Sequence, residues 1–225
     1  MAHPRVRLAA ALAILSGGLL LPSAVVASSQ HERAAISSKS RVVYSVPWGK
    51  WSTASSKWKH LGHATVQGGM LEVRDDRVIV APVLSPIGNY AIETKLRVRA
   101  QTPNVRGAFF GIFFRGAKTV IKTDAASGLN AGLVVNTAAS IASSQAGFCE
   151  VAYGSPEFQP EADYKPGNSW HTYRLDVRGN SFRLLIDGQE ATRIGPVNDL
   201  FSARHVGLVA QFTWLEVGSY RVTTL

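Results

Sequence analysis

Basic side chains are concentrated in one stretch of the sequence, and a carboxylate stands at its start. Positions 94–122 hold seven Lys or Arg residues and no Asp or Glu, namely Lys95, Arg97, Arg99, Arg106, Arg115, Lys118 and Lys122. Glu93 immediately precedes them. The planar guanidinium fork binds carboxylates, sulfates and paired hydroxyl groups through parallel hydrogen bonds. This composition therefore predicts either ion pairing or the binding of a polar or anionic ligand.

The residues around Glu93 alternate in polarity, as expected for a β-strand with one buried face. One set contains Tyr90, Ile92, Thr94, Leu96 and Val98, and the other contains Ala91, Glu93, Lys95, Arg97 and Arg99. The next strand expected is AFFGIFFRG at 108–116, which is apolar on both faces. Such a pattern is typical of a central strand that is covered on two sides.

We expect these two strands to be neighbours, so that one face carries Glu93, Arg97, Arg115 and the ring of Phe113. The three polar side chains would supply contacts to a ligand, and Phe113 would supply an apolar surface. A structural ion pair between Glu93 and an arginine on a solvated sheet is the competing interpretation. Burial in the core is the competing interpretation for Phe113 and for the tryptophans Trp48, Trp51, Trp58, Trp170 and Trp214.

The sequence contains none of the common catalytic motifs that we sought. Glycoside hydrolysis uses two carboxylates roughly 5–10 Å apart, and no expected strand carries a tight same-face pair of acids. Gly-x-Ser-x-Gly, His-Glu-x-x-His and phosphate-loop sequences are absent. The sequence therefore favours a binding protein over an enzyme, with Glu93 as the one acid to test for catalysis.

We expect no cofactor and no metal. His60 and His63 would point to opposite faces of a strand, and no third ligand follows in a recognisable pattern. A structural Ca²⁺ needs clustered oxygen ligands, for which Asp75, Asp76, Asp124 and Asp187 are candidates without a motif. The lone Cys149 has no disulfide partner in the chain and is expected to be buried.

The N-terminus has the three parts of a secretory signal peptide. Arg5 and Arg7 precede an apolar run at 8–21, and small residues follow Pro22. We expect cleavage after Ala27, which would leave a secreted protein without a membrane span. The whole chain has a formal net charge of +9, and removal of residues 1–27 lowers it to +7. A basic secreted protein is suited to anionic polymers, although the charge also serves solubility.

The remaining sequence predicts an all-β protein. We expect a flexible leader at 28–45, because this stretch is polar and rich in small residues. Short β-branched and aromatic runs separated by Gly and Pro follow at 46–225, in the pattern of a two-sheet antiparallel sandwich. The clearest hairpin is WHTYRLDVRGNSFRLLIDGQE at 170–190, with turns at RGNS and Asp-Gly.

The order of these pieces resembles the concanavalin A-like lectin and glucanase superfamily. It resembles more narrowly the secreted bacterial domains grouped with laminin-G-like and 3-keto-disaccharide hydrolase-like proteins. The matching pieces are VQGGMLEV, VIVAP, NYAIETKLRVRA, GAFFGIFFRG, the hairpin at 170–190 and VGLVAQFTWLEVGSYRV. The resemblance implies a jelly roll with a carbohydrate site on its concave sheet. The Glu-x-Asp-x-x-Glu motif of the superfamily's glucanases is absent.

Three functions remain open from the sequence. The first is a secreted, lectin-like domain that binds extracellular glycan on its concave sheet through Glu93, Arg97, Phe113 and Arg115. The second is a glycoside-cleaving enzyme similar to the 3-keto-disaccharide hydrolase-like family. The third is a structural or adhesive module that binds an anionic polysaccharide. Nucleic acid is the less favoured partner.

Overall fold

The computed structural model describes residues 40–46, 57–60, 63–74, 78–101, 108–116, 129–135, 144–150, 159–164, 166–196 and 203–225. All of them belong to the compact unit 38–225. The predicted signal peptide lies outside these ranges, as do Trp48, Trp51, Asp75, Asp76, Asp124 and three of the seven clustered basic residues. No helix within the described ranges is long and apolar enough to cross a membrane.

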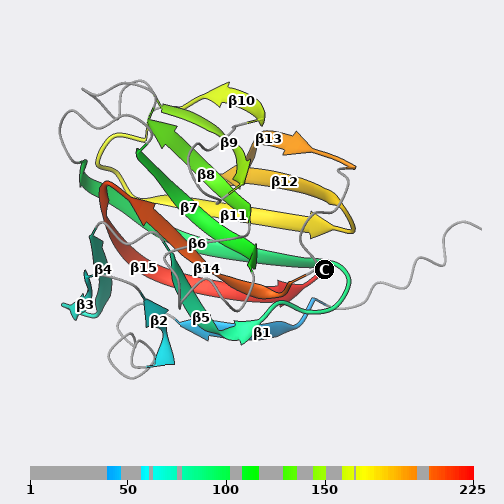
Figure 1. The fold of residues 1–225 in the computed structure, drawn as a ribbon, viewed down its shortest axis with the longest axis horizontal. Coiled ribbons are helices and arrows are strands. Elements are labelled where there is room, and N and C mark those ends of the chain that lie inside the picture. The colour runs from blue at the N-terminus through cyan, green and yellow to red at the C-terminus, as the bar shows by residue number, and fades with distance from the viewer. Residues whose placement is uncertain are drawn as a thin grey trace, which may run out of the picture. The chain divides into compact units, whose positions relative to one another are not determined.

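The described strands form two antiparallel sheets (Figure 1). We name each sheet after a central strand. The β6 sheet has the order β13 (Gln189–Ile194), β12 (Ser181–Ile186), β11 (His171–Arg178), β6 (Tyr90–Gln101), β15 (Thr213–Thr224), β4 (Met70–Arg74), β3 (His63–Gln67), with β1 (Val42–Val46) also on β15. The β7 sheet has the order β10 (Gln159–Asp163), β9 (Ser144–Glu150), β8 (Leu129–Val135), β7 (Ala108–Gly116), β14 (His205–Gln211), β5 (Ile79–Leu84), β2 (Lys59–His60).

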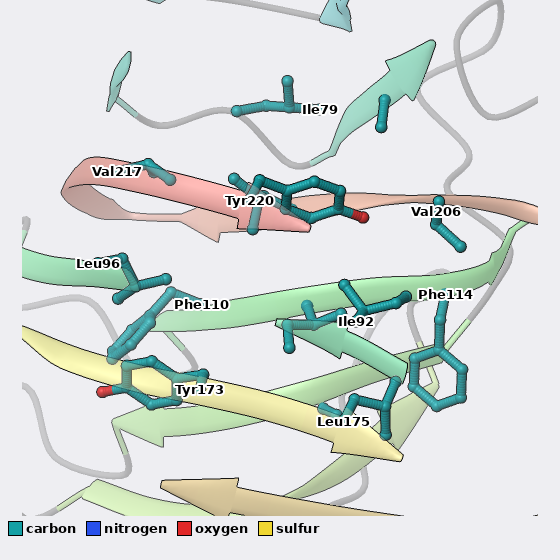
Figure 2. Packing of buried hydrophobic residues seen from close by; sticks show 14 of the residues in the cluster. Ile79, Ile92, Leu96, Phe110, Phe114, Tyr173, Leu175, Val206, Val217 and Tyr220 are labelled. Atoms are coloured by element: carbon teal, nitrogen blue, oxygen red, sulfur yellow. The ribbon is translucent and has the colours of Figure 1, made fainter. Parts of the chain in front are cut away.

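The core lies between the two sheets, and the alternation in β6 determines which side chains enter it. Tyr90, Ile92, Thr94, Leu96 and Val98 are all buried, whereas Lys95 and Arg99 on the opposite face are exposed. Figure 2 shows Ile92 and Leu96 among core side chains from both sheets. The prediction of a two-sheet antiparallel sandwich with this face of β6 inward is confirmed.

Aromatic rings join the sheets across the core. Phe110 of β7 meets Tyr173 of β11 edge to face, with ring centroids 6.0 Å apart. Phe114 of β7 meets Phe182 of β12 in the same way at 5.1 Å. Both are favourable aromatic geometries. Phe110, Ile112 and Phe114 all belong to the buried cluster, so this face of the apolar strand lies against the core.

The predicted pairing of β6 with β7 is wrong. β6 is bonded to β11 and β15, and β7 is bonded to β8 and β14, so the two strands lie in different sheets. Alternation specifies which face of a strand is buried, but it carries no information on which strand lies beside it. Here the chain crosses from one sheet to the other between β6 and β7.

The domain also begins earlier than the sequence predicts. Residues 42–45, expected to end a flexible leader, form most of β1 and pair with β15. Tyr44 of β1 accepts a 2.9 Å hydrogen bond from Nε1 of Trp58, and both rings pack near Tyr220. This contact anchors β1, whose own sequence VVYSV is mostly apolar and β-branched, although the stretch before it is polar.

Candidate functional site

The outward face of the β6 sheet carries charged side chains from every strand between β4 and β13, and we call it the charged face. Its basic residues, Lys95, Arg97, Arg99, Arg174, Arg178, Arg183, Arg193 and Arg221, outnumber its acidic residues, Glu72, Glu93, Asp176, Glu190 and Glu216. They gather on one face because each is the alternate neighbour of a core residue. The face therefore has an excess of positive charge.

A ladder of ion pairs crosses five strands of this face, from β15 through β6, β11 and β12 to β13, where Glu190 lies 3.9 Å from Nη1 of Arg183. Glu93 of β6 accepts from Arg221 of β15 at 2.5 Å and lies 3.5 Å from Nη1 of Arg174 on β11. Arg174 also donates to Oδ1 of Asp176 at 2.8 Å. Arg183 of β12 donates to Oδ2 of the same carboxylate at 2.5 Å. Asp176 is 3% exposed, so its two arginine partners offset the cost of burying its charge.

A second group of ion pairs lies further along β6. Glu216 of β15 is 2.5 Å from Nε of Arg97 and 3.1 Å from Nε of Arg99. The guanidinium carbon of Arg97 stands 4.8 Å above the ring of Trp170, in a cation–π arrangement. The structure thus places the predicted residues Glu93 and Arg97 on one outward face, where each already has a partner within the protein. Their role in ligand binding stays a prediction.

Phe113, predicted as an exposed platform, is fully buried. It lies outside the main core cluster, in line with the alternation of β7. A Cβ atom at Gly116 would stand 2.0 Å from Cζ of Phe113, so the ring occupies the space that this glycine leaves free. The prediction that Phe113 stacks on a ligand is wrong, because the second apolar face of β7 is covered as well.

Arg115 reaches the other sheet instead of Glu93. Its Nη2 donates to the carbonyl oxygen of Gly179 at 2.6 Å, and both terminal nitrogens lie 3.2–3.3 Å from Oδ1 of Asn180. Its guanidinium carbon is also 4.9 Å from the centroid of the Phe182 ring. Gly179 and Asn180 form the turn between β11 and β12. Arg115 therefore fastens this turn to the β7 sheet, and the predicted pair with Glu93 is not formed.

The backbone at Arg115 is in an unusual conformation. Its φ is 51°, in the left-handed region that side chains other than Gly seldom adopt. Such a residue costs roughly 1–2 kcal/mol, and it persists only where neighbouring contacts hold it. The bonds to the turn provide such contacts. On the opposite side of the turn, Asn89 accepts from the backbone nitrogen of Gly179 at 3.1 Å.

A pocket of about 240 Å³ opens beside this turn. The pocket is lined by the end of β11, the start of β12 and the end of β13. Its lining residues are Asp176, Arg178, Ser181, Phe182, Arg183, Arg193, Ile194 and Gly195. Gly195 has a φ of 128°, and a Cβ there would lie 2.6 Å from Cα of Ser181. Only glycine permits this close approach of the two walls.

The pocket was not predicted from the sequence, although the pattern of one strand gives part of it. In the strand at 171–178, apolar residues alternate with polar ones, which places Arg174, Asp176 and Arg178 together on one face. Arg183 and Arg193 lie beside these residues because of the register of β11, β12 and β13. This register pairs Asp176 with Arg183, and Arg183 with Arg193. That register cannot be read from alternation alone.

A separate polar cluster occupies the opposite end of the same hairpin. His171 bonds Oδ2 of Asp187 through Nδ1 at 2.6 Å and the carbonyl of Pro166 through Nε2 at 3.0 Å. The backbone nitrogen of Thr172 donates to Oδ1 of Asp187 at 2.8 Å. Burial raises the pKa of Asp187, but these hydrogen bonds outweigh burial and lower that pKa below its usual value. The Ca²⁺ candidate Asp187 thus serves to close a turn.

Burial and the nearby Asp187 carboxylate raise the pKa of Tyr164 to about 12. Its ring meets His171 edge to face. Within the described ranges, no group of three or more His, Cys, Asp or Glu side chains is arranged to hold a metal ion. Cys149 lies in β9, and its side chain is outside the described part.

No family model matches this sequence, and no curated protein matches it either. Solved structures do match. The VIP36 exoplasmic/lumenal domain, in a Ca²⁺/Man3GlcNAc-bound form, is 12% identical over 82% of this chain and 91% of its own, with a TM-score of 0.60. The carbohydrate recognition domain of Emp47p is 11% identical over 80% of this chain and 95% of its own, at 0.58. The carbohydrate-binding module CBM66 from Bacillus subtilis is 14% identical over 72% and 91%, at 0.55.

These likenesses establish the fold, which is that of the concanavalin A-like lectins. The resemblance read from the sequence is confirmed at this level. The narrower grouping with laminin-G-like and 3-keto-disaccharide hydrolase-like domains stays a prediction. At such low identity no site residue can be transferred, so the site must be argued from this chain's own side chains.

Proposed function

We propose that the protein is a glycan-binding β-sandwich and that its binding site is the pocket beside the turn between β11 and β12. This proposal rests on one observation, that planar, polar side chains line a concave surface. Arg183 and Arg193 line it, and their guanidinium forks keep N–H groups beyond those that bond Asp176 and Glu190, while Ser181 presents a hydroxyl group. Such groups can bond the paired hydroxyls of a sugar, and pockets with few, fixed polar groups are typical ligand sites.

The comparison structures support this proposal at the level of fold. Emp47p contributes a carbohydrate recognition domain, CBM66 is a carbohydrate-binding module, and VIP36 was solved with a mannose-containing ligand. Carbohydrate binding therefore recurs on this architecture. The sequence adds a reason to expect the glycan outside the cell, because residues 1–27 have the pattern of a secretory signal peptide.

Among the alternatives, the glycoside-cleaving enzyme has less support from the described residues. Its single candidate acid, Glu93, has Arg221 and Arg174 on its two carboxylate oxygens. A catalytic carboxylate needs instead an oxygen that can bond the substrate. The anionic-polymer module has more support, because the basic residues of the charged face outnumber its acids.

The proposal predicts binding without turnover on a glycan array. We expect a subset of glycans to bind, and we expect Arg193→Gln to weaken that binding severalfold because it removes one fork from the pocket. Arg99→Gln is the matched control, since Arg99 lies on the same face near the far end of β6. The array should be repeated with and without Ca²⁺. Absence of binding to every glycan would contradict the proposal, and product release lost in Glu93→Gln would favour the enzyme.

A further inference from the structure

We propose that the pocket beside the turn between β11 and β12 selects acidic glycans, with Arg178 binding a carboxylate or sulfate group on the sugar. This inference rests on the proposed glycan-binding function and adds the chemical class of the ligand. Arg178 is the last residue of β11, and its side chain is exposed at the pocket wall. Within the described part of the chain, it has no ion-pair partner.

Two described carboxylates near the pocket, Asp176 and Glu190, already bond other arginines. Asp176 receives Arg174 on one oxygen and Arg183 on the other. Glu190 receives Nε and Nη2 of Arg193, each at 2.6 Å. Arg178 therefore remains as an excess positive charge beside a hollow of about 240 Å³. An anionic group entering there would meet an available guanidinium fork.

The wall that carries Arg178 is held in place before any ligand arrives. Arg178 pairs with Ser181 across the turn, which brings both residues to the same face. Between them, Gly179 is bonded by Arg115 through its carbonyl oxygen and by Asn89 through its backbone nitrogen. A site on a fixed turn loses little conformational entropy on binding. Arg115 is thus a positioning residue for this site.

The size of the pocket limits what it can hold. Pockets for drug-sized ligands span roughly 300–1,000 Å³, and this one is slightly smaller. It therefore suits a single charged sugar unit, with the rest of the glycan outside the pocket. Since the unit must combine hydroxyl groups with an anion, uronic acids and sulfated sugars are the two sources of the expected chemistry.

The test compares four short oligosaccharides by isothermal titration calorimetry. These are oligogalacturonate, its methyl ester, a sulfated galactan oligomer and the neutral galactan oligomer. We expect oligogalacturonate or the sulfated oligomer to bind at least tenfold more tightly than its uncharged counterpart, and the stronger of the two identifies the anion. Arg178→Gln should remove that difference, and its thermal midpoint should match the wild type because Arg178 has no ion-pair partner among the described residues.

Arg99→Gln removes the same charge from the same face and serves as the control. Counting from Ala91, which pairs with Asp176, Arg99 lies about 26 Å along β6. We therefore expect it to change the affinity less than twofold. An equal loss of affinity in both variants would contradict binding in the pocket. It would indicate diffuse electrostatic attraction of the anion to the charged face. If uncharged oligosaccharides bind as well as charged ones, the inference is wrong and the proposed function stands. If no saccharide binds, both are wrong.

Discussion

The two sheets of this sandwich turn very different faces away from the core. On the charged face of the β6 sheet, charged residues alternate with core residues along the strands. Most of these side chains form ion pairs, and apart from Asp176 and Glu216 they are at least partly exposed. On β7 the corresponding positions are apolar, and Phe109 and Phe113 are buried there. A continuous apolar strand signals a face that is covered on both sides, whereas clean alternation signals a face open to solvent. Ligand contacts should therefore be sought on the alternating sheet.

The largest effect is expected for Phe113→Ala, which tests whether the second face of β7 is buried. If the second face of β7 is buried, losing this ring should lower the free energy of unfolding by about 3–5 kcal/mol. Urea denaturation would measure the change. An exposed platform, as the sequence suggested, would instead lose less than about 1 kcal/mol and would lose glycan binding. That outcome would mean the two faces do not differ as described.

An intermediate effect is expected at the link between the sheets. Arg115→Lys keeps the positive charge but removes the fork that bonds Gly179 and Asn180. We expect a loss of about 1–2 kcal/mol in unfolding free energy, together with weaker binding at the pocket that the turn supports. Arg99→Lys is the matched control, with no change expected in binding. Unchanged stability in Arg115→Lys would show that the turn holds its shape without this arginine.

The smallest effect should come from an exposed pair of the charged face. Hydrogen bonding from Arg193 lowers the pKa of Glu190 below its usual value. The contribution to stability is therefore fully present above the unfolded-state pKa and is lost as the pH falls through the folded-state value. Glu190→Gln should differ slightly from the wild type at pH 7 and not at pH 3. The difference should also shrink in high salt. A large effect at pH 7 would mean that the ladder is more buried than described.

Local pattern was sufficient for much of the fold. The burial of alternate residues in β6, the core side of β7 and the turns at Gly179-Asn180 and Asp187-Gly188 all follow from short-range rules of side-chain direction and backbone preference. The sequence also indicated an all-β sandwich and the concentration of charge near Glu93. These properties depend on residues close together in the chain, so they can be predicted from the sequence.

Only the tertiary structure decided which strands are neighbours, and with that the site. Arg115 and Asn180 are 65 residues apart, and nothing in their local sequence pairs them. Many strand orders satisfy the same alternation, because it specifies a buried face without specifying a partner. The packing of two complete sheets selects one order. That order brings Arg178, Arg183 and Arg193 to one pocket, and it assigns Arg115 to the turn beside it.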